Sequence, residues 1–387
     1  MTKPRVLLAI TVYNGRDVVE RSLQSATSLT QDVADIDVLV LDDCSPEPGF
    51  SDDVAHWCEF HGHRYYCSPR NIGIPRNVNL ALLTAMDANY DYVIISNSDV
   101  VYGANAVDEL VTAAASDARI GAVTSWSTNV SIYSIPNRDP DRHLGDQVHA
   151  DEVARALSDR FSGQVLDIPA GISFSMLIPV PVVRTVGLMD PVFGRGYCEE
   201  TDWSRRCLAA GYRLVLGPGS FVYHAGGGST VEAGLLAPGD TTVPANERII
   251  DLRYPGFRSD VDTFYSSGVL QDLQRQAVDT IITNAVERRG FDVAVGLRPA
   301  AVDLDADSPV CVDLVLDGEH AVATVDALGF TDTTWGPALD VAAGLRSRFG
   351  VPNTVDLFDV GPWAWRTAEL LAAGGDISQH RNYPARV

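Results

Sequence analysis

Apolar runs of strand length alternate with amphipathic helical segments through the first hundred residues of this chain. Continuous apolar runs, which are typical of strands buried on both faces, occupy residues 5–12, 36–41 and 92–96. This alternation predicts an α/β fold, with a mainly parallel sheet covered by helices on both faces. The connecting elements that we expect are helices at 16–29, near 51–60 and at about 75–88, and a short strand at 64–68.

Polar side chains follow each of the three long predicted strands directly. In parallel sheets of this class, ligands bind beyond the carboxyl ends of the strands. We therefore expect these side chains to converge on one crevice. They are Thr11, Tyr13 and Asn14 at the end of the first strand, Asp42 and Asp43 at the end of the second, and Asn97 and Asp99 at the end of the third.

Asp99 stands between two apolar segments, residues 93–95 and 100–101. A surface turn does not need such close apolar flanks, whereas a metal or phosphate site at the end of a rigid strand does. Hard divalent cations prefer oxygen ligands of this kind. An Asx turn that caps the next element is the alternative explanation of the same pattern.

A second informative stretch begins at residue 197. The acids Glu199, Glu200 and Asp202 precede a helical pattern that we expect to end at Gly211. Strand-like segments follow, ending in His224 and three glycines. Acids are common at helix N-termini, where the helix dipole stabilises them, so capping alone could explain the cluster.

The pattern changes beyond about residue 240, and we place a domain boundary between residues 238 and 239. The second part contains a polar helical stretch at 261–289, a hairpin that turns at Asp317-Gly318, and an amphipathic helix near 337–348. We therefore predict a larger α/β domain over 1–238 and a smaller α+β domain over 239–387. The role of the second domain would be acceptor binding or self-association, and a homo-oligomer is one outcome.

The formal net charge of −22 argues against binding to nucleic acid or to an anionic membrane, because both need clustered positive charge. No apolar run reaches membrane-spanning length and no signal-peptide pattern is present, so we expect a cytoplasmic protein. Neither the dinucleotide-binding G-x-G-x-x-G after the first strand nor a P-loop occurs. The main sequence evidence for a nicotinamide dehydrogenase or for a P-loop NTPase is therefore missing.

Five segments, in this order, resemble the family two glycosyltransferases over residues 4–235. They are "AITVYNG", "VLVLDDCSPE", "NIGIPRNVNLAL", "NSDV", and "CEETDW" with the following "VYHAGGGS". The resemblance implies the Rossmann-like GT-A fold and, in most members, inverting transfer from a nucleotide-sugar donor. The chain beyond residue 235 resembles no family that we identify.

The resemblance also implies roles for individual residues. Asp99 and His224 would bind Mn²⁺ or Mg²⁺, although Asn97 stands where the family's motif usually begins with aspartate. Glu200 would be the general base, kept ionised by the helix dipole, while Asp202 would position the helix or bind the acceptor. The residues expected to bind the nucleotide sugar are Thr11, Tyr13, Asn14, Asp42, Asp43, Asn71, Gly73, Arg76, Asn97, Ser98, Gly171 and Glu199.

Two other functions fit the sequence. A nucleotidyltransferase acting on a sugar phosphate shares a parallel sheet and an acidic metal site, and a non-catalytic nucleotide-sugar-binding protein could share the fold. The transferred sugar would be a hexose or a deoxyhexose. The acceptor could be a saccharide, a lipid-linked molecule or a small molecule.

Overall fold

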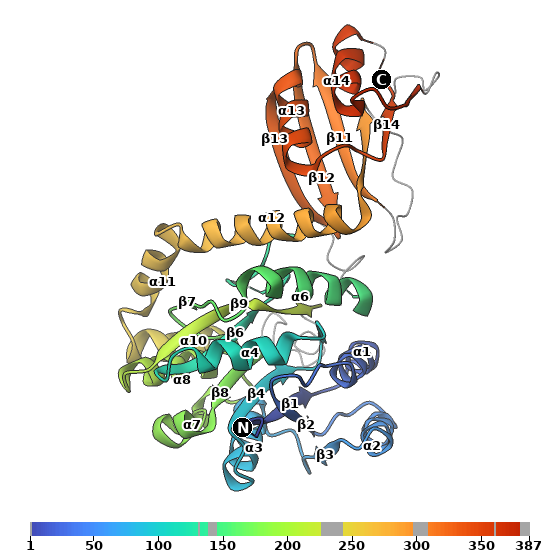
Figure 1. Ribbon diagram of the computed structural model, residues 1–387. Helices are drawn as coiled ribbons and strands as arrows, with labels where there is room; N and C mark the ends of the chain where they lie inside the picture. The colour runs from blue at the N-terminus through green and yellow to red at the C-terminus, as the bar shows by residue number, and fades with distance from the viewer. Residues whose placement is uncertain are drawn as a thin grey trace. The chain divides into compact units, whose positions relative to one another are not determined.

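The computed structural model of the protein describes residues 2–130, 132–137, 145–225, 243–296, 309–359 and 361–379. These residues form two compact units (Figure 1). The first contains the described residues up to Gln274, apart from Pro136 and Asn137. The second contains those two residues and the described residues from Arg275 onward.

The first unit is built on a mixed sheet whose strands run in the order β3-β2-β1-β4-β8-β6-β9-β5, with β7 paired to β9. Its first half, β3-β2-β1-β4, is entirely parallel, as the sequence predicts, and β8 then runs antiparallel to both β4 and β6. The elements are β1 (Arg5–Val12), α1 (Arg16–Thr27), β2 (Asp35–Asp42), α2 (Phe50–Phe60), β3 (Arg64–Cys67), α3 (Ile74–Asp87), β4 (Tyr92–Asn97), β5 (Val100–Tyr102), α4 (Ala106–Ala115), β6 (Ile120–Trp126), α6 (Gln147–Phe161), β7 (Leu166–Asp167), β8 (Ser175–Pro179), α7 (Val180–Val186), η1 (Pro191–Phe193), α8 (Glu199–Ala209), β9 (Arg213–His224), α10 (Val243–Arg253), α11 (Phe257–Ser266) and the start of α12 (Val269–Arg289).

Helices cover both faces of this sheet, which confirms the predicted α/β class. Alternate residues of β1, such as Leu8 and Ile10, pack with α1, α2 and α4 in one apolar core. The intervening residues, such as Leu7 and Ala9, are also fully buried, so they face the opposite layer. There α3 packs on β1 and β4 and contacts α7, which in turn contacts α8.

The second unit is a smaller α+β structure, as predicted. Its sheet has the order β13-β12-β11-β10-β14-β15, and α13, α14 and the C-terminal part of α12 pack on it. The predicted hairpin is confirmed, because β11 and β12 are antiparallel and Gly318 takes a positive φ in the turn. The elements are β10 (Phe291–Val295), β11 (Val310–Asp317), β12 (His320–Ala327), β13 (Phe330–Pro337), α13 (Ala338–Phe349), β14 (Thr354–Leu357), α14 (Pro362–Ala372) and β15 (Ile377–Gln379).

The division between the units falls after Gln274, whereas the sequence analysis places the domain boundary at 238/239. The difference arises because α10 packs into the first unit. Its Asn246 donates to three backbone carbonyls there, and its Arg253 pairs with the buried carboxylate of Asp202. In the described parts of the chain, no helix combines the length and the apolar character needed to cross a membrane.

These contacts of α10 predict how truncated forms will behave. A chain ended after residue 238 loses Asn246, Arg253 and Tyr254, which leaves the buried Asp202 carboxylate with Arg206 as its remaining charged partner among the described residues. We therefore expect a chain ended after Gln274 to unfold at a clearly higher denaturant concentration than one ended after residue 238. Equal midpoints in urea would show that α10 adds nothing to the stability of the first unit.

Candidate active site at the carboxyl edge of the sheet

The topology brings the predicted site residues to one edge of the first sheet. Strands β1, β2, β3 and β4 are parallel, and β6 and β9 point the same way because both relate to β4 through the antiparallel β8. The carboxyl ends of β1, β2, β4 and β9 therefore lie along a common edge. The three strand ends expected to converge thus lie at one edge of the sheet, and their convergence on a ligand crevice stays a prediction.

Asp99 and His224 meet at this edge although 125 positions separate them in the chain. The short strand β5 pairs with the end of β9 so that Val100 lies opposite His224, and the Ala225 amide donates to the Asp99 carbonyl at 2.9 Å. Nε2 of His224 then lies 3.2 Å from Oδ1 of Asp99, whose side chain is 2% exposed. The Phe174 ring packs beside the imidazole, with ring centroids 5.6 Å apart.

The tautomer of His224 follows from its second hydrogen bond. Nδ1 lies 2.8 Å from the carbonyl oxygen of Asn129, which can only accept, so Nδ1 carries the proton. In the neutral imidazole, Nε2 therefore presents a lone pair toward the Asp99 carboxylate. Burial lowers the pKa of His224, but the Asp99 carboxylate and the Asn129 carbonyl outweigh burial, and the net pKa is raised.

Two acceptors that face each other need a cation or a proton between them. In the described part of the chain, Oδ1 of Asp99 is buried and has no hydrogen-bond donor of good geometry. The neighbouring Ser98 hydroxyl is also buried without a partner, and the Asn97 amide lies 3.4 Å from Nε2 of His224. Carboxylate, imidazole and amide groups suit Mn²⁺ or Mg²⁺, so the residues present fit a divalent cation.

This set is small for a metal site. Among the described residues, no group of three or more His, Cys, Asp or Glu side chains is arranged to hold an ion. The protein would thus supply Asp99, His224 and the Asn97 amide, and further ligands would come from a phosphate group or water. The three glycines after His224 fall outside the described residues.

Glu199 and Glu200 form a buried pair of carboxyl groups at the start of α8. Oε2 of each is inaccessible and has no hydrogen-bond partner among the described residues, although the Glu200 residue as a whole is only half-buried. Burial raises the pKa of Glu199 well above its usual value, and the charge of Glu200 raises it further. Burial also raises the pKa of Glu200, so the expected acidifying effect of the helix dipole does not prevail.

The raised pKa of Glu199 has a consequence for stability. A carboxyl group whose pKa is higher in the folded protein favours folding below the pKa of the unfolded chain, and this contribution is lost as the pH rises. We expect Glu199→Gln, which stays neutral, to raise the melting temperature of the metal-free protein, by an amount that grows as the pH rises above the usual pKa of a glutamate. The matched control is Glu59→Gln on the exposed surface of α2. A difference in melting temperature that does not change with pH would contradict the raised pKa.

Asp202, two residues further along α8, is occupied by protein donors. One oxygen accepts from Nε of Arg206, and the other accepts from Arg253 and from the Tyr254 hydroxyl, at 2.7–2.9 Å. Its side chain is 1% exposed. Of the two predicted roles, these contacts favour positioning of the helix over contact with an acceptor.

Protein donors also occupy the two aspartates at the end of β2. Asp42 accepts from Ser45, from the Ser51 hydroxyl and from the Tyr65 hydroxyl. Asp43 accepts the amide hydrogens of Ile72 and Gly73, one on each oxygen, and burial raises its pKa despite these two bonds. Both side chains therefore fix the loops of this edge, and each oxygen of Asp43 keeps a second lone pair for a ligand.

The remaining predicted residues all lie in segments at this edge. The Thr11 hydroxyl donates to the Ser96 carbonyl. In the loop after β2, the Ser45 hydroxyl accepts from the Asn14 backbone amide, and the Glu47 backbone amide donates to the Asn14 side-chain oxygen. Tyr13 is half-buried, while Asn71 and Arg76 are exposed around the start of α3. At Gly73 an added Cβ would meet the Gly194 carbonyl at 2.2 Å, and at Gly171 it would meet the Met176 sulfur at 2.6 Å, so neither position has room for a side chain.

Several polar groups of the site escape the sequence analysis. Ser127 and Thr128 follow β6 with buried hydroxyls that lack a partner among the described residues. Asn129, in the same run, orients His224. These residues could have been predicted, because they form a polar run directly after the buried strand at residues 120–126. Nothing in the sequence points to Asn246 of α10.

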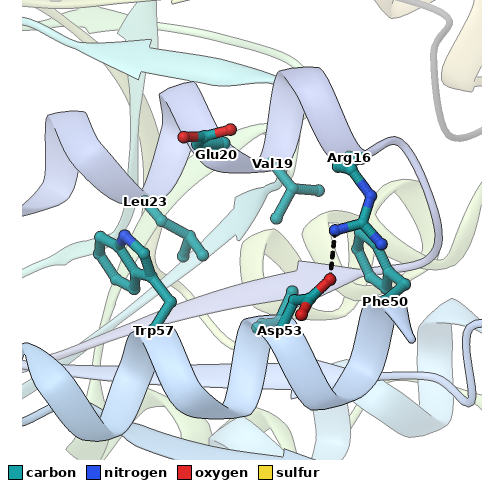
Figure 2. A pocket seen from close by; sticks show the side chains of 8 residues that line it. Arg16, Val19, Glu20, Leu23, Phe50, Asp53 and Trp57 are labelled. Atoms are coloured by element: carbon teal, nitrogen blue, oxygen red, sulfur yellow. Dashed lines mark hydrogen bonds and ion pairs between the residues drawn. The ribbon is translucent and has the colours of Figure 1, made fainter.

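A pocket elsewhere in the first unit is separate from these residues. Figure 2 shows it between α1 and α2, where Leu23, Phe50 and Trp57 line it and Arg16 forms an ion pair with Asp53. None of the predicted site residues lines it. The candidate site is thus defined by its polar groups at the sheet edge and not by this hollow.

Comparison with known proteins supports the resemblance found in the sequence. Residues 8–151 match the family described as glycosyl transferase family 2, which confirms the resemblance over the parallel half of the sheet and includes Asp99. No match is found among curated proteins.

Two solved structures are among those to which the chain is similar. A crystal structure of GalNAc-T7 with UDP, GalNAc and Mn²⁺ is 13% identical, with 57% of this chain and 44% of that chain covered and a TM-score of 0.45. This chain therefore spans less than half of that protein. The mannosyltransferase PcManGT from Pyrobaculum calidifontis, in complex with GDP-Man and Mn²⁺, is 17% identical, with 72% and 74% covered and a TM-score of 0.43.

Proposed function

We propose that this chain, whose residues 8–151 match glycosyl transferase family 2, moves a hexose or deoxyhexose from a nucleotide-diphosphate sugar to an acceptor hydroxyl, with inversion at the anomeric carbon. The observation that carries the proposal is the pair formed by Asp99 and His224. Two buried acceptors face each other across 3.2 Å at the carboxyl edge of the sheet, and one of them, Asp99, lies in the segment that matches the family. A divalent cation, Mn²⁺ or Mg²⁺, bound by both acceptors would remove the repulsion between them.

At the donor side, the chain's task is to hold a diphosphate and to stabilise its departure. A bound divalent cation supplies positive charge to the leaving diphosphate. Asp99, His224 and Asn97 would hold that cation, and Arg76, exposed at the start of α3, would supply a further positive charge to the diphosphate. The loop that Asp43 fixes through the amides of Ile72 and Gly73 frames the nucleotide.

At the acceptor side, Glu200 takes the proton. As the acceptor oxygen bonds to the anomeric carbon, the bond from that carbon to the diphosphate oxygen breaks, and the hydroxyl proton passes to the Glu200 carboxylate. Its raised pKa makes it a better proton acceptor near neutral pH than an ordinary glutamate. The raised pKa of Glu199 favours its neutral form, which limits the charge repulsion in the pair, while Asp202 holds the helix.

Ligand binding without turnover gives the first test. Binding to the folded state raises the melting temperature, so UDP, GDP and dTDP can be screened by thermal shift with and without Mn²⁺. We expect at least one nucleotide to stabilise the protein more in the presence of Mn²⁺ than the separate effects of nucleotide and metal combined. Purely additive effects for all three nucleotides would contradict a metal–diphosphate site.

A further inference from the structure

The turn that leads into the Glu199–Glu200 pair has an unusual backbone. Gly194 and Gly196 take positive φ angles, and so do Tyr197 and Cys198, at 72° and 74°. Two consecutive non-glycine residues in the left-handed region are strained, and such strain persists only where the surroundings hold it. The second of them is the residue immediately before α8.

Asn246 of α10 holds this turn from one side. Its side-chain amide donates to the carbonyls of Phe193, Gly196 and Tyr197 at 3.0, 2.8 and 3.0 Å. Asn246 is 4% exposed, so these carbonyls have little access to water as an alternative partner. Because the amide group has two hydrogens, one of them is shared between two of the three carbonyls, and a single side chain thus contacts three backbone acceptors of one turn.

The other side of the turn rests on the start of α3. The Ile74 amide donates to the Arg195 carbonyl at 3.3 Å, and a Cβ on Gly196 would meet the Ile74 side chain at 2.7 Å. This close packing leaves the turn little freedom on that side. The position of Glu200 is then fixed between α3, which borders the expected nucleotide site, and α10.

We propose that Asn246 is a positioning residue for Glu200, acting through the turn at residues 193–198. The inference rests on the proposed function, in which Glu200 accepts the proton. Asn246 itself touches no reacting atom. Displacing a catalytic base by about 1 Å can lower the rate about 100-fold. Loss of the hydrogen bonds from Asn246 to this turn should therefore lower turnover and leave donor affinity unchanged.

The test compares Asn246→Ala with Ile250→Ala. Ile250 is 3% exposed and lies one turn further along α10, and its apolar side chain can donate no hydrogen bond to the turn, so it controls for a general loss of packing. With the sugar nucleotide and Mn²⁺ that give the fastest release of nucleoside diphosphate, we expect kcat of Asn246→Ala to fall about 10- to 100-fold while KM for the donor changes less than about threefold. Ile250→Ala, assayed well below its melting temperature, should keep kcat within about threefold.

Hydrogen–deuterium exchange adds a readout that does not depend on activity. We expect amides of residues 193–200 to exchange faster in Asn246→Ala than in Ile250→Ala at equal distance from each melting temperature. Asn246→Ser, which keeps one hydroxyl donor, serves if Asn246→Ala does not fold, and it should show the same effects to a smaller degree.

Unchanged kcat together with unchanged exchange at residues 193–200 would overturn the positioning role. Equal losses of kcat in Asn246→Ala and Ile250→Ala would also overturn it, since packing alone would then explain the effect. Failure of the proposed function has a different signature, because the unmodified protein would then release no nucleoside diphosphate from any donor.

Discussion

Glu200→Gln is expected to lower turnover about 10²- to 10⁴-fold, the usual contribution of general base catalysis. Glutamine keeps the size of the side chain but cannot accept the acceptor's proton. Because Glu200 has no hydrogen-bond partner on Oε2 among the described residues, the change breaks no bond there and should leave the fold intact. Donor affinity, measured as the shift in melting temperature with nucleotide and Mn²⁺, should stay at the level of the unmodified protein.

Glu199→Gln is the matched control for this experiment. The pKa of Glu199 is raised further than that of Glu200, so glutamine resembles the state that Glu199 already has, and turnover should change little. If Glu199→Gln abolishes turnover while Glu200→Gln remains active, the base is Glu199. Asp202→Asn should act differently again, by lowering stability, since Arg206, Arg253 and Tyr254 all bind its carboxylate.

Asp99→Asn is the second change for which we expect a large effect. The substitution keeps the shape but removes the charge that faces His224, and so removes the reason for a cation to bind there. We expect kcat/KM for the donor to fall at least about 10²-fold, and the Mn²⁺-dependent part of nucleotide binding to disappear. Titration of Mn²⁺ in the thermal-shift assay measures this directly.

Asp91→Asn provides the control at the opposite end of the same strand. Asp91 immediately precedes β4 and accepts from the Arg5 amide, far along the strand from the carboxyl edge. Its replacement should leave both the Mn²⁺ titration and kcat/KM close to those of the unmodified protein. Normal turnover of Asp99→Asn in the presence of Mn²⁺ would show that Asp99 has only a structural role in the turn.

Local patterns allowed the parallel half of the sheet to be predicted. Strands such as β1 and β4 are buried on both faces, so their sequences are continuously apolar and their ends are marked by the polar residues that follow. The turn at Gly318 carries the same kind of local signal. Each of these signals lies within a few residues of the feature it predicts.

The features that were not predicted depend on contacts between distant segments. Asp99 and His224 face each other because β5 pairs with the end of β9. The tautomer of His224 is set by its hydrogen bond to the Asn129 carbonyl. The raised pKa of Glu200 depends on burial, which the adjacent sequence does not reveal. The domain boundary failed to match the division between units for the same reason, because the contacts of Asn246 reach back about fifty positions.

The identity of the released phosphate product tests glycosyl transfer most directly. The full chain is incubated with Mn²⁺ and a panel of UDP-, GDP- and dTDP-linked hexoses and deoxyhexoses, and the nucleotide products are separated and quantified. We predict release of nucleoside diphosphate from at least one donor, abolished by chelation of the metal and by Asp99→Asn. Release of pyrophosphate when a nucleoside triphosphate and a sugar phosphate are supplied would instead identify a nucleotidyltransferase, and metal-dependent binding of a nucleotide sugar with no diphosphate release from any donor would identify a binding protein.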